Sequence, residues 1–160
     1  LLHTVFHAFI KCALFLTAGI VIYQTGKTRV CELQGIGKEM PRTLWCYTFA
    51  ALGLIGIPPM SGFVSKWYLA QGALSAQAGV FRYLGPAVLL VSALLTAGYL
   101  LPVTIDGFLP GKNWKKESEK LEAPPGMLFP LALLAVLTIL LGLFPNPLAS
   151  YIRDLAVTLL

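Results

Sequence analysis

The chain alternates long apolar runs with short polar connections. Apolar residues fill stretches of about 1–24, 43–76, 84–106 and 127–144, and about 20 such residues are needed to cross the hydrocarbon core of a bilayer. The pattern therefore predicts an all-α membrane protein with four transmembrane helices. A fifth apolar piece, 147–160, contains Arg153 and Asp154 and favours a short C-terminal interfacial helix.

The second stretch is too long for one straight span and contains GIPPMSG at residues 56–62. Because Pro58 and Pro59 have no backbone N–H, the carbonyls of Leu54 and Ile55 lose their helical donors. We expect two half-helices, about 43–56 and 62–76, with a break at the level of the membrane interior. A core helix followed by a re-entrant segment is the alternative.

Three small residues surround the two prolines at the predicted break. Gly56 and Gly62 provide the backbone freedom that the break requires. Ser61 is expected to cap the amino end of the second half-helix.

The first stretch carries His3, His7 and Lys11, although each ionisable side chain in hydrocarbon costs about 2.5–3.5 kcal/mol. Their spacing of four places them on one helix face, with about 6 Å of rise between neighbours. Two cations at that distance repel, so a proton gained at one position favours release from the next. This pattern predicts a proton relay. A zinc pair in the HxxxH pattern, and packing histidines beside a snorkelling lysine, are the alternatives.

Lys66 lies in the first or second turn of the second half-helix. Burial and the positive end of that helix dipole both disfavour its ammonium form, so we expect Lys66 to exchange its proton near neutral pH. Snorkelling to an interface is the alternative. In the third span, Thr96 and Tyr99 either extend a polar path from Lys66 or form a satisfied helix–helix contact.

The charge distribution predicts an orientation. The 160 residues are 57% hydrophobic and 12% charged, with a net charge of +5, and basic residues at span ends explain that excess better than nucleic-acid binding. Connections 25–42 and 107–126 hold eight of the twelve Lys and Arg residues, which predicts that both are cytoplasmic. The eight are Lys27, Arg29, Lys38, Arg42, Lys112, Lys115, Lys116 and Lys120.

The sequence has no phosphate-binding loop, no dinucleotide fingerprint and no haem or iron–sulfur pattern. Cys12, Cys31 and Cys46 are scattered and indicate neither a disulfide framework nor a metal site. We therefore expect no cofactor and no redox chemistry in this chain itself. It would be driven by partner subunits or by an ion gradient, or it would be a structural membrane subunit without an ion path.

Two motifs resemble a known family. HTVFHAFIKCALFLTAG, followed about 55 residues later by GLIGIPPMSGFVSKWYL, resembles the proton-translocating, antiporter-like membrane subunits of respiratory complex I (NADH-quinone oxidoreductase), Mrp-type Na⁺/H⁺ antiporters and membrane-bound hydrogenases. The last span ends in LLGLFPNP, which is also similar to the family.

The resemblance implies that residues 1–160 are the C-terminal part of one transmembrane ion-translocation domain built from inverted repeats. In that family a broken helix carries a central lysine, matched by Lys66, and the preceding helix carries a relay, matched by His3, His7 and Lys11. It also implies translocation of protons, or exchange of Na⁺ for H⁺, alongside other membrane subunits in a bacterial or archaeal inner membrane.

Overall fold

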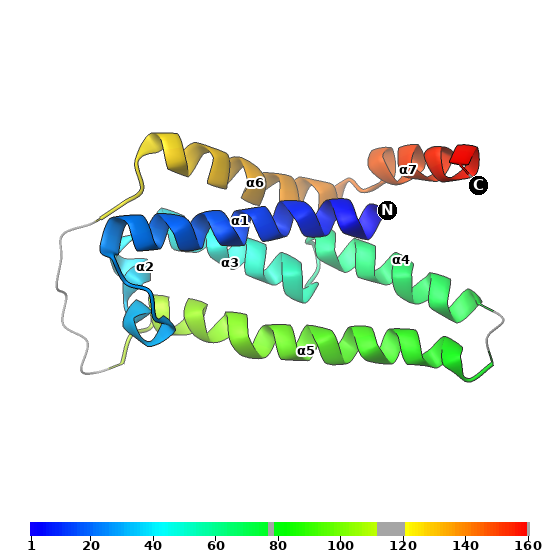
Figure 1. The fold of residues 1–160 in the computed structure, drawn as a ribbon, viewed down its shortest axis with the longest axis horizontal. Coiled ribbons are helices and arrows are strands. Elements are labelled where there is room, and N and C mark those ends of the chain that lie inside the picture. Colours follow the sequence, from blue (N-terminus) through cyan, green and yellow to red (C-terminus); the bar gives the residue numbers. More distant parts are fainter. Residues whose placement is uncertain (77–78, 112–120, 160) are drawn as a thin grey trace.

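The described residues form a bundle of helices (Figure 1). The computed structural model describes residues 1–76, 79–111 and 121–159. Its longer helices are α1 (Leu2–Thr25), α3 (Pro41–Ile55), α4 (Ser61–Ser75), α5 (Phe81–Phe108), α6 (Pro125–Leu143) and α7 (Asn146–Leu159), and its short ones are η1 (Val30–Leu33) and α2 (Ile36–Glu39). The predicted all-α fold is confirmed for these residues.

Within the described ranges, three helices are long and apolar enough to cross a membrane. They are α1, α5 and α6, with 24, 28 and 19 residues, and they coincide with the predicted spans 1–24, 84–106 and 127–144. Helices α3 and α4 have 15 residues each, so neither reaches the usual length of a span alone. The fourth crossing therefore stays a prediction about this pair.

The predicted break in the second stretch is present. Helix α3 ends at Ile55, and the next residue, Gly56, caps it with a left-handed φ of 89°, a conformation that glycine adopts without steric cost. The N–H groups of Gly56 and Ile57 both donate to the carbonyl of Leu52. The next turn cannot continue because prolines occupy positions 58 and 59, and α4 begins at Ser61.

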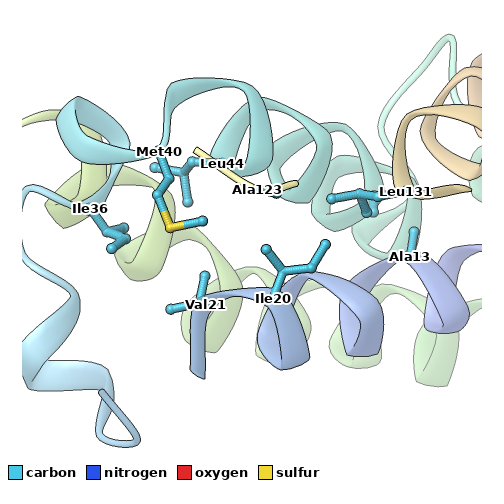
Figure 2. Packing of buried hydrophobic residues seen from close by; sticks show 9 residues of the cluster. Ala13, Ile20, Val21, Ile36, Met40, Leu44, Ala123 and Leu131 are labelled. Carbon is cyan, nitrogen blue, oxygen red and sulfur yellow. The ribbon is translucent and has the colours of Figure 1, made fainter. Parts of the chain in front are cut away.

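Helix α1 lies beside both halves of the broken pair, and its amino end extends past the turn between α3 and α4, alongside α4 (Figure 1). Ala13 and Ile20 of α1 pack with Leu44 of α3 and Leu131 of α6 in the main buried cluster (Figure 2). Small buried residues such as Ala13 let helix backbones approach closely, as is typical of membrane bundles. This packing fixes the position of α1, along its own axis, relative to the break.

The connection 25–42 differs from a simple loop. It contains η1 and α2, and Ile36 and Met40 are buried in the main cluster. The N–H of Gly35 donates to the carbonyl of Asp106 at 2.9 Å, which attaches the connection to α5. Hydrophobic periodicity did not reveal these helices because each has only four residues.

Glu122 fixes the segment that leads into α6. Its carboxylate accepts hydrogen bonds from the N–H groups of Arg42 and Thr43 and from the Thr43 hydroxyl, at 3.1, 3.3 and 2.8 Å. These N–H groups belong to the first turn of α3, where no intrahelical acceptor exists. The four lysines of connection 107–126 lie outside the described residues, so the side of the membrane on which it lies stays a prediction.

Helix α7 occupies the predicted fifth apolar piece, 147–160, and extends to Leu159. It follows α6 after a short turn and lies at the same end of the bundle as the first residue of α1 (Figure 1). Its interfacial position stays a prediction.

Candidate functional site

Lys66 lies in the second turn of α4, and its side chain reaches back across the break to α3. Its Nζ donates hydrogen bonds to the carbonyls of Leu54 and Ile55, at 2.9 and 2.8 Å. These are the two carbonyls whose helical donors would have come from residues 58 and 59, both prolines. The helix break thus creates the acceptors and Lys66 supplies the donors.

This geometry gives Lys66 an electrostatic partner that the sequence alone did not reveal. The amino end of α4 has a dipole that opposes a positive charge, as the sequence predicted. The last carbonyls of α3 are the negative end of a second helix dipole, and they contact the ammonium directly. The charge on Lys66 is therefore stabilised by α3 and opposed by α4 and by burial.

Gly56 is required at this site for two reasons. Its φ of 89° is strained for any residue with a side chain. A Cβ at this position would also lie 3.0 Å from Cδ of Lys66 and 3.5 Å from its Nζ. The absence of a side chain at 56 therefore leaves the space through which Lys66 reaches α3.

Gly62 has a different role from the predicted one. Among the described glycines, positive φ values occur at Gly26, Gly35, Gly56 and Gly79, so Gly62 does not supply a left-handed turn. A Cβ on Gly62 would clash with the carbonyl oxygen of Gly53. Its function is to let the first turn of α4 pack against the backbone of α3.

The prediction that Ser61 caps α4 is wrong. The residue at the cap position is Met60, and no side chain among the described residues caps this helix end. Ser61 is the first helical residue and is 1% exposed, and its Oγ has no hydrogen-bond partner among the described residues. It lies one residue too late to reach the free N–H groups of the first turn.

The residues of α1 that the sequence predicted as a relay lie beside the start of α4. His3 Nδ1 is 2.9 Å from Ser65 Oγ, and Ser65 Oγ donates to the carbonyl of Gly62. The rings of His3 and His7 have centroids 5.6 Å apart, close to the separation expected for one helical turn. The predicted line of titratable groups is therefore level with the helix break.

A cavity of about 270 Å³ connects these side chains. It is lined by all six residues predicted for the relay and its extension, namely His3, His7, Lys11, Lys66, Thr96 and Tyr99. A water molecule needs about 10–15 Å³ of such space, so the cavity has room for several. None of the described residues that line it is acidic, so protons within it would be held by bases and water.

Thr96 and Tyr99 line this cavity without a described bond to Lys66. The Thr96 hydroxyl donates to the carbonyl of Ser92 in its own helix, and Tyr99 is 57% exposed. Their predicted path role therefore rests on position alone.

Sequence reasoning missed Ser65, which contacts His3 from a position 62 residues away. It also missed Tyr47, whose hydroxyl donates to the carbonyl of Leu100 at 3.3 Å. No local pattern marks either contact, because each depends on how separate helices pack.

The chain is similar in sequence to a known family of membrane proteins. The family described as NADH:quinone oxidoreductase/Mrp antiporter, TM matches residues 1–96. The chain is 40% identical over 168 residues to NADH-quinone oxidoreductase subunit N of Desulforudis audaxviator, covering 98% of the chain and 33% of that protein. It is 34% identical over 155 residues to a Na(+)/H(+) antiporter protein of Bacillus subtilis, covering 94% of the chain and 30% of that protein.

A third relative is NADH-quinone oxidoreductase subunit L of Mycobacterium tuberculosis strain H37Rv. It is 34% identical over 143 residues, which cover 89% of the chain and 22% of that protein. The chain thus spans a third or less of the length of these relatives.

Proposed function

This chain belongs to the NADH:quinone oxidoreductase/Mrp antiporter transmembrane family, and from this premise we propose that it translocates protons through a relay of lysine, histidine and water. Family membership supports ion translocation by an antiporter-like subunit. The relay is the specific part of the proposal.

The observation that carries the proposal is the position of the Lys66 amine. It donates to two carbonyls freed by the helix break and lines one cavity, with room for several water molecules, together with His3, His7 and Lys11. Four basic groups in one cavity cannot all be charged at low cost, because like charges repel and burial disfavours each charged form. A proton that arrives at one of them therefore favours release from another.

In the proposed cycle, Lys66 alternates between two states. As an ammonium it is held by the carbonyls of Leu54 and Ile55. When a proton reaches His7 or Lys11, repulsion across the cavity favours transfer of the Lys66 proton to cavity water. The neutral amine then accepts the next proton from the α1 line, and the carbonyls of α3 bind the new ammonium.

The names of the relatives refer to two kinds of complex. The Desulforudis and Mycobacterium relatives are named for NADH-quinone oxidoreductase, and the Bacillus relative is named a Na(+)/H(+) antiporter. We propose that this chain works beside other membrane proteins of one complex, driven by a redox reaction performed elsewhere, with Na⁺/H⁺ exchange as the alternative. Dependence of the proton flux on sodium separates the two.

We further propose that α3 and α4 together form the fourth crossing. Two helices of 15 residues with the turn between them exceed the hydrocarbon thickness of about 30 Å. Connections 25–42 and 107–126 then lie on the cytoplasmic side and α7 lies at the opposite interface. Labelling of single cysteines placed in 112–120 from one side of sealed vesicles tests this orientation.

The central experiment replaces Lys66 with methionine, which is similar in length and carries no proton. Inverted native-membrane vesicles are energised with NADH or with a sodium gradient, and the resulting pH gradient is followed by dye quenching. We expect Lys66→Met to abolish the gradient while the yield of assembled protein stays normal. Lys11→Ala should reduce the gradient less.

The matched control is Arg82→Met, because Arg82 is an exposed cation at the start of α5 whose described contacts are with the neighbouring Tyr83. This variant should pump normally. A full gradient in Lys66→Met would end the proposal. Lost assembly of Lys66→Met would favour the structural alternative, in which the bonds from Lys66 serve only to join α4 to α3.

A further inference from the structure

A second cavity follows the first along the seam between α1, α3 and α5. It measures about 230 Å³. The two cavities are lined by successive turns of the same three helices: Lys11 then Thr17 on α1, Gly53 then Tyr47 on α3, and Tyr99 then Val103 on α5. The second cavity therefore continues the line of the first towards the carboxyl end of α1.

A small apolar cluster separates the two cavities. It consists of Ile10, Ala51, Leu54 and Leu100, and all four are buried. Leu14 and Tyr47 pack against it. Ile10 and Leu54 also line the first cavity, whereas Tyr47 lines the second. The cluster is thus a plug between the two spaces, about two helical turns thick along α1.

Tyr47 brings a polar atom to this plug. Its hydroxyl donates to the carbonyl of Leu100 at 3.3 Å, and Leu100 directly follows Tyr99, which lines the first cavity. The bond is long for an O–H donor, so it is easily exchanged for a bond to water. The hydroxyl is therefore positioned to act between the two cavities.

The far end of the second cavity carries charge. Lys27 lines it, and the Lys27 Nζ lies 3.7 Å from Oε2 of Glu39. Thr28 lines the same end. A charged and hydroxylated mouth beyond the end of a membrane helix is suited to contact with bulk water.

We propose that the second cavity is the vestibule through which the relay exchanges protons with one side of the membrane, and that Tyr47 and its apolar plug form the gate between them. This inference rests on the proposed function. Apolar constrictions close ion paths by excluding water, so the plug at rest prevents leakage past Lys66.

When water enters the plug, the Tyr47 hydroxyl exchanges its bond to Leu100 for bonds to water. It gives its proton to a water in one cavity and receives a proton from a water in the other. Tyrosine ends the step unchanged, and one proton has passed the plug. The same step runs in either direction, so the charge on the Lys66 side sets the direction.

The first test replaces Tyr47 with phenylalanine, which keeps the ring and removes the hydroxyl. In native-membrane vesicles we expect the proton flux to fall about tenfold, the factor that corresponds to one lost hydrogen bond of the upper usual strength. The control is Tyr23→Phe, because Tyr23 is 68% exposed on α1, a helix of the same seam, and lines neither cavity. It should pump normally.

Normal flux in Tyr47→Phe, together with no flux in Lys66→Met, would overturn the gate and leave the proposed function intact. Flux in Lys66→Met would instead overturn the proposed function itself. The two failures are therefore distinguishable in one set of vesicles.

The second test does not depend on Tyr47. Val103 lines the second cavity, and Val103→Cys is made in a protein whose Cys12, Cys31 and Cys46 are replaced by serine. A charged, water-soluble thiol reagent should modify the new cysteine and block the flux. The control is Leu94→Cys, because Leu94 lies on the apolar outer face of α5 and lines neither cavity. A charged reagent does not enter the apolar layer of the membrane, so this cysteine should react far more slowly.

Equal, slow reaction at both positions would show that the second cavity is dry or filled by a lipid chain, and would overturn the vestibule. Fast modification of Val103→Cys without loss of flux would also overturn it, because a blocked vestibule must stop the relay.

Discussion

Lys66 and the prolines opposite it form one unit at the scale of single residues. Pro58 and Pro59 remove the N–H groups that would have bonded Leu54 and Ile55, and the amine of Lys66 takes their place. Unpaired carbonyls at membrane depth cost several kcal/mol. The break is therefore stable in the presence of a donor, and the donor is a group that can also release a proton.

Gly56 offers a test of this unit. Gly56→Ala should lower the free energy of unfolding by about 1–2 kcal/mol, because alanine disfavours the left-handed conformation. The new Cβ would also crowd the Lys66 side chain, so the proton flux should fall together with stability. Thermal unfolding of the purified protein and the vesicle assay measure the two effects.

Gly72→Ala is the control for this change. Gly72 lies in the same helix as Lys66, and a Cβ there would meet no atom within 4 Å. Alanine at this position should raise helix stability by about 0.5–1 kcal/mol and leave the flux unchanged. If the two variants behaved alike, Gly56 would have no special role.

Residue-level prediction succeeded where the chemistry is local. The carbonyls freed by Pro58 and Pro59 follow from the i to i+4 rule of the helix, and the structure places the break there. The cap at Ser61 failed because the boundary of α4 falls one residue earlier than expected. Gly62 does not lie in the break, because it belongs to the first turn of α4, where its missing side chain allows close packing against the backbone of α3.

At the scale of elements, the position of α1 along its axis beside the break decides which groups the proposed relay can reach. The spacing of His3, His7 and Lys11 predicted a stripe on one helix face. Only the packing of α1 on α3 and α4 shows that this stripe is level with Lys66, through the contact of His3 with Ser65. Local sequence patterns cannot predict a contact between residues that are 62 positions apart.

Helix α6 supports the break from a third direction. A Cβ on Gly142 would clash with the carbonyl oxygen of Pro59 and would lie 2.6 Å from the backbone nitrogen of Ser61. Gly142→Ala should therefore displace the turn between α3 and α4 and lower the free energy of unfolding by about 1–3 kcal/mol. Proton flux should decrease as well, because the acceptors of Lys66 move with the turn.

The control for α6 is Gly98→Ala in α5, where a Cβ would meet no atom within 4 Å. Both variants are made in membrane helices and add the same methyl group. Unchanged stability in both, measured by thermal unfolding in one detergent, would contradict the close approach of α6 to the break.

At the scale of the whole molecule, three helices form one continuous seam. Residues of α1, α3 and α5 line both cavities, one on either side of the apolar plug. Sequence patterns predicted these helices and the six polar residues proposed for the relay and its extension, all of which line the first cavity. They did not predict the second cavity, since its lining is mostly apolar side chains that a pattern assigns to any buried face.

The outer surface is also informative. Helix α5 exposes large apolar side chains along its length, including Leu90, Leu94 and Leu95. An exposed apolar face of this extent belongs against lipid or another membrane protein.

The central claim is that Lys66 must release its proton, beyond holding α3 and α4 together. Lys66→Arg tests this directly, because a guanidinium also donates to carbonyls and carries the same charge but stays protonated in proteins. The measurement is the pH gradient formed by vesicles whose content of assembled protein matches wild type. The account predicts normal assembly and no gradient, whereas a wild-type gradient in Lys66→Arg would contradict it.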